Sequence, residues 1–139
     1  MSIANSDIPT ILHNYKHIAV VGLSEKPHRA SYSVSAYMQA QGYDIIPVNP
    51  RYAGKTILGK KVYASLSEAK AAGEPIEIVD VFRRSEDVPP VANEAIEVGG
   101  KVLWLQLGIE NDLSAEKAKA SGLEIVQDKC IKIEYSIMR

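Results

Sequence analysis

The chain has 139 residues, 46% of them hydrophobic, and a net charge of −1, so it can form one domain with its own core and has no overall charge that would attract nucleic acid or an anionic membrane. No apolar run approaches the roughly 20 residues that a membrane-spanning helix needs. Cys130 is the single cysteine and the N-terminus lacks a basic and apolar signal segment, so we expect a protein of the reducing cytoplasm.

The first half of the chain alternates between predicted helices and strands. In order, we expect a short helix within residues 3–15 on the sheet edge, a buried strand at 18–21, a helix at 32–41 and a strand at 44–48. Gly22 ends the first strand, and Gly42 stands where a left-handed C-cap would end the helix. Pro47 cannot donate to a ladder, which favours a place at the strand end or where the strand has no neighbour.

The second half continues this alternation. We expect a loop at 49–61 and a short edge strand at 61–63. The next helix starts with the capping-box spacing of Ser65 and Glu68 and ends at Gly73. The remaining elements are a strand at 76–82, a helix from Pro89-Pro90 to Gly99-Gly100, a strand at 101–107, a helix at 114–121 and a strand at 123–126. Trp104 is expected in the core. The tail at 130–139 receives no assignment, and Cys130 is expected as a small apolar residue after the last strand.

This order of elements predicts an α/β fold. We expect a single doubly wound, Rossmann-like domain over residues 1–139, with a mostly parallel sheet of 5–6 strands and helices on both faces. Ligands of such sheets bind outside the carboxyl ends of the strands. The loops that follow strands, at 22–31, 49–54, 83–89 and 108–112, are therefore the candidate binding segments.

The loop after the first strand has the features of a phosphate cradle. Gly22 would let the backbone approach a phosphate, and the helix that starts near Ser31 or Ser33 would point its free N–H groups at the same place. Ser24 and Ser31 could donate hydroxyl groups to phosphate oxygens. The alternatives are an ordinary turn between strand and helix, and an N-cap role for Ser31.

The end of the second strand indicates a phosphorylated ribose. A dinucleotide site for NAD would place Gly-x-Gly-x-x-Gly in the first loop and a carboxylate at this strand end, whereas the chain has one glycine there and Arg51. A cation favours the 2′-phosphate of NADP or the 3′-phosphate of coenzyme A. Further cations in the candidate loops are Lys26, Arg29, Arg83 and Arg84, although basic residues in loops are also simply exposed.

Several sequence blocks resemble one known family, the CoA-binding Rossmann-type domains, in particular small stand-alone bacterial proteins of that type. The blocks are Val-Val-Gly22-Leu-Ser24, Lys26-Pro27, His28-Arg29-Ala-Ser31, Gly42-Tyr43, Pro47-Val48-Asn49-Pro50, Val81-Phe82-Arg83-Arg84-Ser85, Trp104-Leu-Gln106-Leu-Gly108-Ile109 and Asp128-Lys129-Cys130. They cover nearly the whole chain. The chain is also similar to the CoA-binding parts of the succinyl-CoA synthetase alpha subunit and of NDP-forming acyl-CoA synthetases.

The resemblance implies binding of CoA or acyl-CoA, with the pyrophosphate over the Gly22 loop and the adenosine near residues 49–52. The cofactor-binding residues predicted from loops and resemblance together are Gly22, Leu23, Ser24, Lys26, Arg29, Ser31, Asn49, Pro50, Arg51, Tyr52, Phe82, Arg83 and Arg84. Those synthetases also carry a phosphorylated histidine in a further domain, for which 139 residues leave no room. We therefore expect a binding protein without catalysis of its own.

No catalytic or metal site is predicted. The three histidines lie in the N-terminal quarter, and with one cysteine they give no metal-ligand spacing. Two alternatives remain open: an NADP-dependent oxidoreductase, and a protein-interaction module that binds no nucleotide. The expected partner is the small molecule CoA, without nucleic acid or membrane, and a homo-oligomer or a protein partner stays open.

Overall fold

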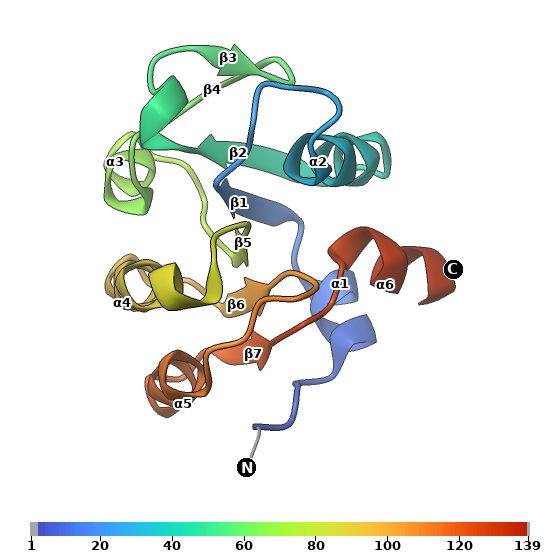
Figure 1. Ribbon diagram of the computed structural model, residues 1–139, viewed down its shortest axis with the longest axis vertical. Coiled ribbons are helices and arrows are strands. Elements are labelled where there is room, and N and C mark those ends of the chain that lie inside the picture. Colours follow the sequence, from blue (N-terminus) through green and yellow to red (C-terminus); the bar gives the residue numbers. More distant parts are fainter. Residues whose placement is uncertain (1–2, 139) are drawn as a thin grey trace.

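The computed structural model describes residues 3–138 as a parallel sheet between two layers of helices (Figure 1). Met1, Ser2 and Arg139, the ends of the predicted domain and tail, lie outside the described residues. The elements are α1 (Ile8–Asn14), β1 (His17–Val21), α2 (Ala30–Ala40), β2 (Asp44–Val48), the 3₁₀ turn η1 (Pro50–Tyr52), β3 (Thr56–Ile57), β4 (Lys60–Lys61), α3 (Leu66–Ala71), β5 (Ile78–Val81), the 3₁₀ turn η2 (Ser85–Asp87), α4 (Val88–Glu97), β6 (Val102–Leu105), α5 (Asp112–Ala120), β7 (Glu124–Val126) and α6 (Ile131–Met138).

The main sheet has five parallel strands in the order β2-β1-β5-β6-β7. The chain moves outward from β1 to β2 and then returns to the other side of β1 to form β5, so the strand order reverses at β1. The predicted doubly wound, Rossmann-like α/β fold is confirmed. In such a sheet the crevice for ligands opens where the order reverses, which here is above the carboxyl ends of β2, β1 and β5.

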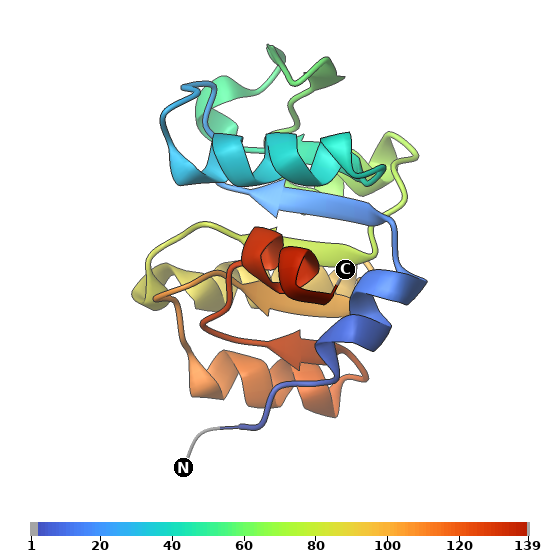
Figure 2. The same ribbon diagram turned by 90° about the vertical axis from the view of Figure 1, so that its right-hand side faces the viewer.

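Alternate residues of the strands enter two separate cores, one on each face of the sheet. Ile18 and Val20 pack beneath α1, α2 and α6, whereas Ala19 and Val21 pack beneath α3, α4 and α5. Figures 1 and 2 show these two layers of helices on opposite faces. Trp104 is fully buried, as predicted, and its indole N–H donates to the carbonyl of Lys129 at 2.8 Å. Because both faces are covered, the strands are apolar almost throughout.

The N-terminal helix is shorter than predicted. Residues 3–7 are not helical, and Asp7 caps α1 by accepting from the N–H of Thr10. The backbone N–H of Ser6 donates to the carbonyl of Ile125 at 2.8 Å, and the Asn5 side chain bonds with the backbone of Gln127. The extended start of the chain therefore covers the open edge of β7, which explains why it does not join the helix.

The segment between β2 and α3 differs from the prediction of a loop and a strand at 61–63. It contains η1 and a small antiparallel pair, β3 with β4, and β4 ends at Lys61. Tyr63 instead forms an isolated parallel bridge to Val48 of β2. Two-residue strands carry too little alternation to be recognised in the sequence. Pro47 lies in β2, an outer strand of the main sheet, in agreement with the prediction.

The C-terminal tail, for which the sequence predicts no element, forms α6. This helix starts directly after Cys130 at the carboxyl edge and runs back across the face that α2 also covers (Figure 2). Ile131 is fully buried, and the Tyr135 ring makes edge contacts with the rings of Tyr37 and Tyr43. Cys130 is partly buried against the same core. The helix therefore completes one of the two layers.

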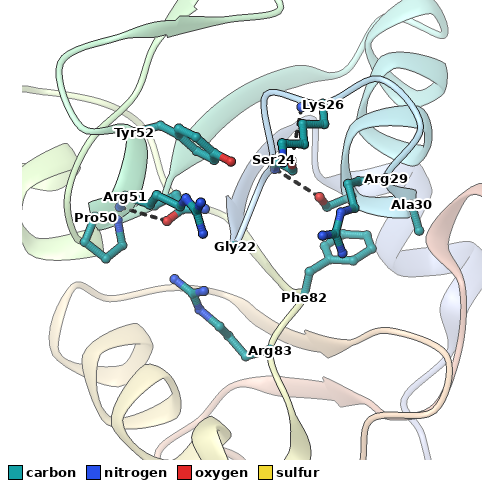
Figure 3. Close-up of a pocket in the computed structure, with 12 residues that line it drawn as sticks. Gly22, Ser24, Lys26, Arg29, Ala30, Pro50, Arg51, Tyr52, Phe82 and Arg83 are labelled. Carbon is teal, nitrogen blue, oxygen red and sulfur yellow. Dashed lines mark hydrogen bonds between the residues drawn. The ribbon is translucent and has the colours of Figure 1, made fainter.

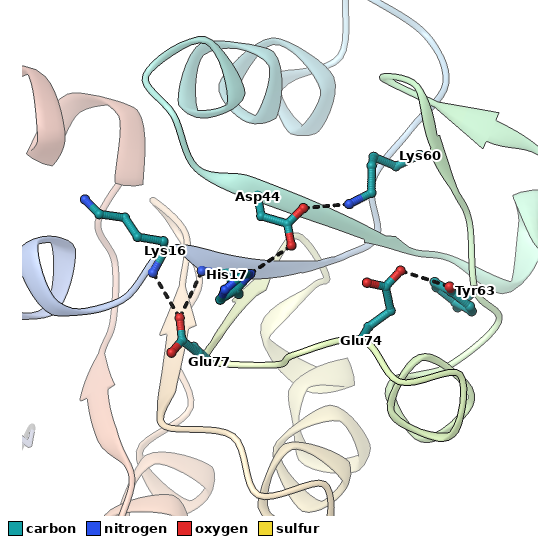
Figure 4. Close-up of polar contacts among 7 residues, drawn as sticks. All are labelled: Lys16, His17, Asp44, Lys60, Tyr63, Glu74 and Glu77. Atoms are coloured by element: carbon teal, nitrogen blue, oxygen red, sulfur yellow. Dashed lines mark hydrogen bonds and ion pairs between the residues drawn. The ribbon is translucent and has the colours of Figure 1, made fainter.

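Polar contacts fix the opposite, amino edge of the sheet (Figure 4). One Glu77 carboxylate oxygen accepts from the backbone N–H groups of Lys16 and His17, both at 3.0 Å. Asp44 at the start of β2 contacts His17 at 2.9 Å and Lys60 at 2.6 Å. Burial would raise the Asp44 pKa, but these hydrogen bonds outweigh burial and lower it. The contacts join β1, β2 and β4 at the edge away from the crevice.

Candidate functional site

A cavity of about 560 Å³ opens at the carboxyl ends of β1, β2 and β5 (Figure 3). Three loops and the first turn of α2 form its walls. It is lined by Gly22, Ser24, Lys26, Arg29, Ala30, Ser31, Asn49, Pro50, Arg51, Tyr52, Phe82 and Arg83. Eleven of the predicted cofactor-binding residues are among these, so the fold brings together three segments that lie far apart in the sequence, at 22–31, 49–52 and 82–83.

Gly22 lies at the base of the cavity in a conformation that favours glycine, with φ of +94°. Its N–H donates to the carbonyl of Val48 at 2.8 Å. A Cβ on Gly22 would stand 2.4 Å from the carbonyl oxygen of Phe82. The Phe82 backbone, directly after β5, therefore lies so close to position 22 that only glycine fits there. The phosphate approach expected from the sequence is not needed to explain this residue.

Two serines determine the shape of the loop after β1. The backbone N–H of Ser24 donates to the Ser31 hydroxyl oxygen at 3.0 Å, and the N–H of Lys26 donates to the Ser24 hydroxyl oxygen at 3.1 Å. Ser31 is not the N-cap of α2, because Arg29 occupies that position. The Ser31 side chain instead ties the loop to the first turn of the helix.

The N-terminus of α2 faces the cavity without a side-chain cap. Within residues 3–138 no side chain accepts from its first-turn N–H groups, and Arg29 and Ala30 line the cavity at that point. The first N–H groups of a helix have no partner inside it, and the helix dipole gives this end partial positive charge. An anion in the cavity can therefore accept hydrogen bonds from the backbone of α2.

Asn49 links two walls of the cavity and is itself buried. Its side-chain N–H donates to the carbonyl of Leu23 at 3.0 Å, and its side-chain oxygen accepts from the N–H of Arg51 at 3.0 Å. The amide nitrogen and the amide oxygen of the Asn49 side chain therefore both form hydrogen bonds within the protein. Asn49 therefore positions Arg51 relative to the loop after β1.

The cavity carries a concentrated positive charge. Lys26, Arg29, Arg51 and Arg83 line it, the lining includes no acidic residue, and within residues 3–138 none of the four forms an ion pair. Figure 3 shows Arg51 and Arg83 extending toward one another from two loops, with Arg29 on the other side. Unpaired cations around a concave site attract an anionic ligand.

Two predicted site residues do not line the cavity. The side chain of Leu23 is fully buried in the core beneath α2. Arg84 points to its own loop, where its guanidinium lies 3.1 Å from Asp87 and 3.4 Å from Glu86. Neighbouring residues point in different directions, which is why Arg83 reaches the cavity and Arg84 does not.

Sequence reasoning missed two features of the site. Ala30, the first residue of α2, lines the cavity, and an alanine side chain carries no signal of a binding role in the sequence. Glu25 of the first loop pairs with Lys55 at 3.6 Å and thereby joins the loop after β1 to the segment after η1. The opposite charges of Glu25 and Lys55 were visible in the sequence, but their contact depends on the fold.

A buried carboxyl group lies on β5, two residues before Phe82. Asp80 accepts from the side-chain N–H of Gln106 at 2.6 Å, and both residues are almost completely buried. Burial raises the Asp80 pKa to about 7, and the hydrogen bond from Gln106 opposes this only in part. Asp80 does not line the cavity.

Within residues 3–138 no group of three His, Cys, Asp or Glu side chains is arranged to hold a metal ion. None of the helices in this part of the chain has the length and apolar character required to cross a membrane.

The sequence model of a family described as "CoA binding domain" matches residues 16–136. The chain is 43% identical over 136 residues to the uncharacterized protein YneT of Bacillus subtilis (strain 168). The alignment covers 98% of this chain and 97% of that protein. The solved structure of a hypothetical protein from Pyrococcus horikoshii OT3 superposes with a TM-score of 0.88 at 37% identity, covering 97% of this chain and 92% of that one.

A larger enzyme contains the same fold. The structure of dinucleotide forming acetyl-coenzyme A synthetase 1 of Ca. Korarchaeum cryptofilum, in complex with phosphate and ADP, matches with a TM-score of 0.68 at 21% identity. The match covers 82% of this chain but 26% of the synthetase chain. At this identity the likeness concerns the fold alone.

Proposed function

This chain belongs to the CoA-binding domain family, as the resemblance predicted, and from that premise we propose that its cavity binds coenzyme A or an acyl-CoA. The observation that carries the proposal is the set of four cations without ion pairs, Lys26, Arg29, Arg51 and Arg83, around one cavity. Family membership supports a CoA-related role, and the cavity supplies the groups for it.

The charge of the ligand matches the charge of the cavity. Coenzyme A carries a pyrophosphate with about two negative charges and a 3′-phosphate with about two more at neutral pH. Four cationic side chains and the uncapped N-terminus of α2 offset this charge. Charge-assisted hydrogen bonds to phosphate are about twice as strong as neutral ones, so such a site binds without a deep apolar pocket.

Each part of the nucleotide has a place in the proposal. The pyrophosphate lies over the loop after β1 and the first turn of α2, near Lys26 and Arg29. The phosphorylated ribose lies near η1, where Arg51 binds the 3′-phosphate. The Tyr52 ring forms the wall beside Arg51, whose guanidinium carbon lies 5.8 Å from the ring centre.

We propose a binding role without catalysis. The residues that line the cavity include no histidine, cysteine or carboxylic acid, the groups that most often act as general acid or base. The binding site and the absence of such groups together favour a protein that holds or delivers the ligand.

A thermal-shift series with CoA, NADPH and NADH tests the proposal. A ligand at 100 times its Kd adds about 2.7 kcal/mol to folding stability, which is readily measured in a chain of this size. We expect stabilisation by CoA and little by NADH. Stronger stabilisation by NADPH than by CoA would favour an oxidoreductase, and no shift with any nucleotide would favour a protein-interaction module.

A further inference from the structure

The proposed position of the nucleotide sets the direction in which the rest of the ligand extends. The ribose phosphate lies over β2 and the pyrophosphate over β1, and the next strands in the sheet are β5 and then β6. The pantetheine arm leaves the pyrophosphate on the side opposite the ribose. Along the carboxyl edge, that side leads over β5 toward β6.

The arm is long enough to pass β6. Neighbouring strands lie about 4.8 Å apart, so two steps from β1 to β6 span about 10 Å. Between pyrophosphate and sulfur the arm has about twelve bonds, the reach of about four extended residues, or roughly 14 Å. The sulfur, and any acyl group on it, would therefore lie beside the segment that follows β6.

That segment presents an apolar side chain on a rigid turn. Leu107 is 64% exposed at the second position of a turn in which the N–H of Ile109 donates to the carbonyl of Gln106 at 2.9 Å. Gly108, at the third position, has φ of +84°, as a type II turn requires. Its N–H donates to the Asp128 carboxylate at 2.6 Å. The exposure of Leu107 is therefore fixed by the backbone.

The turn is joined to the loop that carries Arg83 of the cavity. The hydroxyl oxygen of Ser85 accepts from the N–H of Glu110 at 3.1 Å, and the carbonyl of Ser85 accepts from the Asn111 side chain at 3.1 Å. Leu113, in the first turn of α5, is 81% exposed. Single exposed apolar residues are common on protein surfaces and need no explanation. Leu107 and Leu113 lie within one short segment, and such a grouping is typical of a surface that contacts a ligand or partner.

The segment of residues 107–113 contains two carboxylates and no lysine or arginine. Glu110 and Asp112 are exposed, and Asp128 is partly buried beneath the turn. Within residues 3–138 none of these three carboxylates forms an ion pair. A second carboxylate at the end of an acyl group would meet repulsion here, whereas a neutral chain would gain apolar contact with Leu107.

We propose that the segment of residues 107–113 is the acyl end of the site and selects neutral, apolar acyl groups of acyl-CoA over acyl groups that end in a carboxylate. This inference rests on the proposed binding of CoA and adds the class of ligand. Leu107 contacts the acyl chain, and Glu110 and Asp112 disfavour a terminal carboxylate.

Calorimetric titrations with CoA, acetyl-CoA, butyryl-CoA, hexanoyl-CoA and succinyl-CoA test the inference on three proteins: the parent chain, Leu107→Ser, and Ile137→Ser as a matched control. Ile137 is 71% exposed in the last turn of α6, away from the carboxyl edge. The measured quantity is the affinity of each acyl-CoA relative to CoA within the same protein. This ratio removes any effect of a substitution on the nucleotide part of the site.

In the parent chain and in Ile137→Ser we expect the ratio to rise from acetyl to hexanoyl, by at most about fourfold for each methylene. Succinyl-CoA should bind at least threefold more weakly than butyryl-CoA, which has the same number of acyl carbons, and added salt should narrow that gap. In Leu107→Ser the rise with chain length should be largely lost.

Two results would overturn the inference and leave the proposed function intact: equal affinity for CoA and all acyl-CoAs, or a rise with chain length that persists in Leu107→Ser. Succinyl-CoA binding as tightly as butyryl-CoA at low salt would overturn the selection against carboxylates. Failure of CoA itself to bind would overturn the proposed function, and this inference with it.

Discussion

Gly22 at the end of β1 lies so close to Phe82 at the end of β5 that a Cβ on the glycine would stand 2.4 Å from the Phe82 carbonyl oxygen. The two residues directly follow the adjacent strands β1 and β5 and lie at the base of the cavity. The contact holds the two loops that carry Lys26 and Arg83 at a fixed separation. Gly22 therefore shapes the cavity by packing of the backbone.

Gly22→Ala should destabilise the fold more than glycine replacement does elsewhere. Gly54→Ala is the matched control, because Gly54 has a similar φ of +86° and a Cβ added to it would have no atom within 4 Å. The left-handed conformation alone costs about 1–2 kcal/mol, and a clash with backbone adds about 1–3 kcal/mol. Urea unfolding of both variants measures the difference. Equal losses would show that the Phe82 contact relaxes without cost.

Arg51→Ala should weaken CoA binding about tenfold to one-hundredfold and change binding of dephospho-CoA little. A charge-assisted hydrogen bond is worth about 1.5–3 kcal/mol, and only CoA has the 3′-phosphate that accepts it. Titration of both ligands at two salt concentrations measures this, and the salt dependence of CoA binding should fall in the variant. Arg84→Ala is the control, because Arg84 lies outside the cavity. Equal losses for both ligands would assign Arg51 to the pyrophosphate, with Arg83, which also lines the cavity, the next candidate for the 3′-phosphate.

Ser31→Ala should lower both folding stability and CoA affinity. The Ser31 hydroxyl is the acceptor for the N–H of Ser24 and fixes the loop after β1. Loss of this bond costs about 1 kcal/mol, and a mobile loop binds phosphate less tightly. Ser33→Ala, which changes an exposed serine of the same helix, is the control. CoA affinity unchanged in Ser31→Ala would mean that the loop keeps its shape without this bond.

Asp80→Asn should remove a pH dependence from the stability of the protein. Burial raises the Asp80 pKa to about 7 in the folded chain, whereas an unfolded chain has the ordinary value of about 3.9. Between these values the folded state holds a proton that the unfolded state has lost. The free energy of unfolding therefore falls as pH rises from about 4 through 7, by about 4 kcal/mol at most.

Urea midpoints of the parent chain and Asp80→Asn between pH 4 and pH 9 check this expectation. The side-chain oxygen of asparagine can still accept from Gln106. The variant should gain stability relative to the parent as pH rises, and the difference should level off above pH 7. A constant difference across the range would show that Asp80 does not hold its proton in the folded state.

The sequence by itself determined the class of fold and the location of the candidate site. Apolar runs such as residues 18–21, each followed by a glycine or a polar loop and then a helix, are typical of parallel strands with crossover helices. Parallel strands place their carboxyl ends at one edge, so Lys26, Arg51 and Arg83 could be assigned to that edge before any contact was known. Local periodicity carries this information.

The tertiary structure decided which side chains meet and what each one does. Arg83 reaches the cavity while Arg84 turns to Asp87, and the Ser31 hydroxyl accepts from the N–H of Ser24 and does not cap the helix. The requirement for glycine at position 22 comes from the carbonyl of Phe82. These contacts join separate segments, and their distances depend on strand register and helix packing. A linear pattern does not encode them, because each is set by the position of the whole backbone.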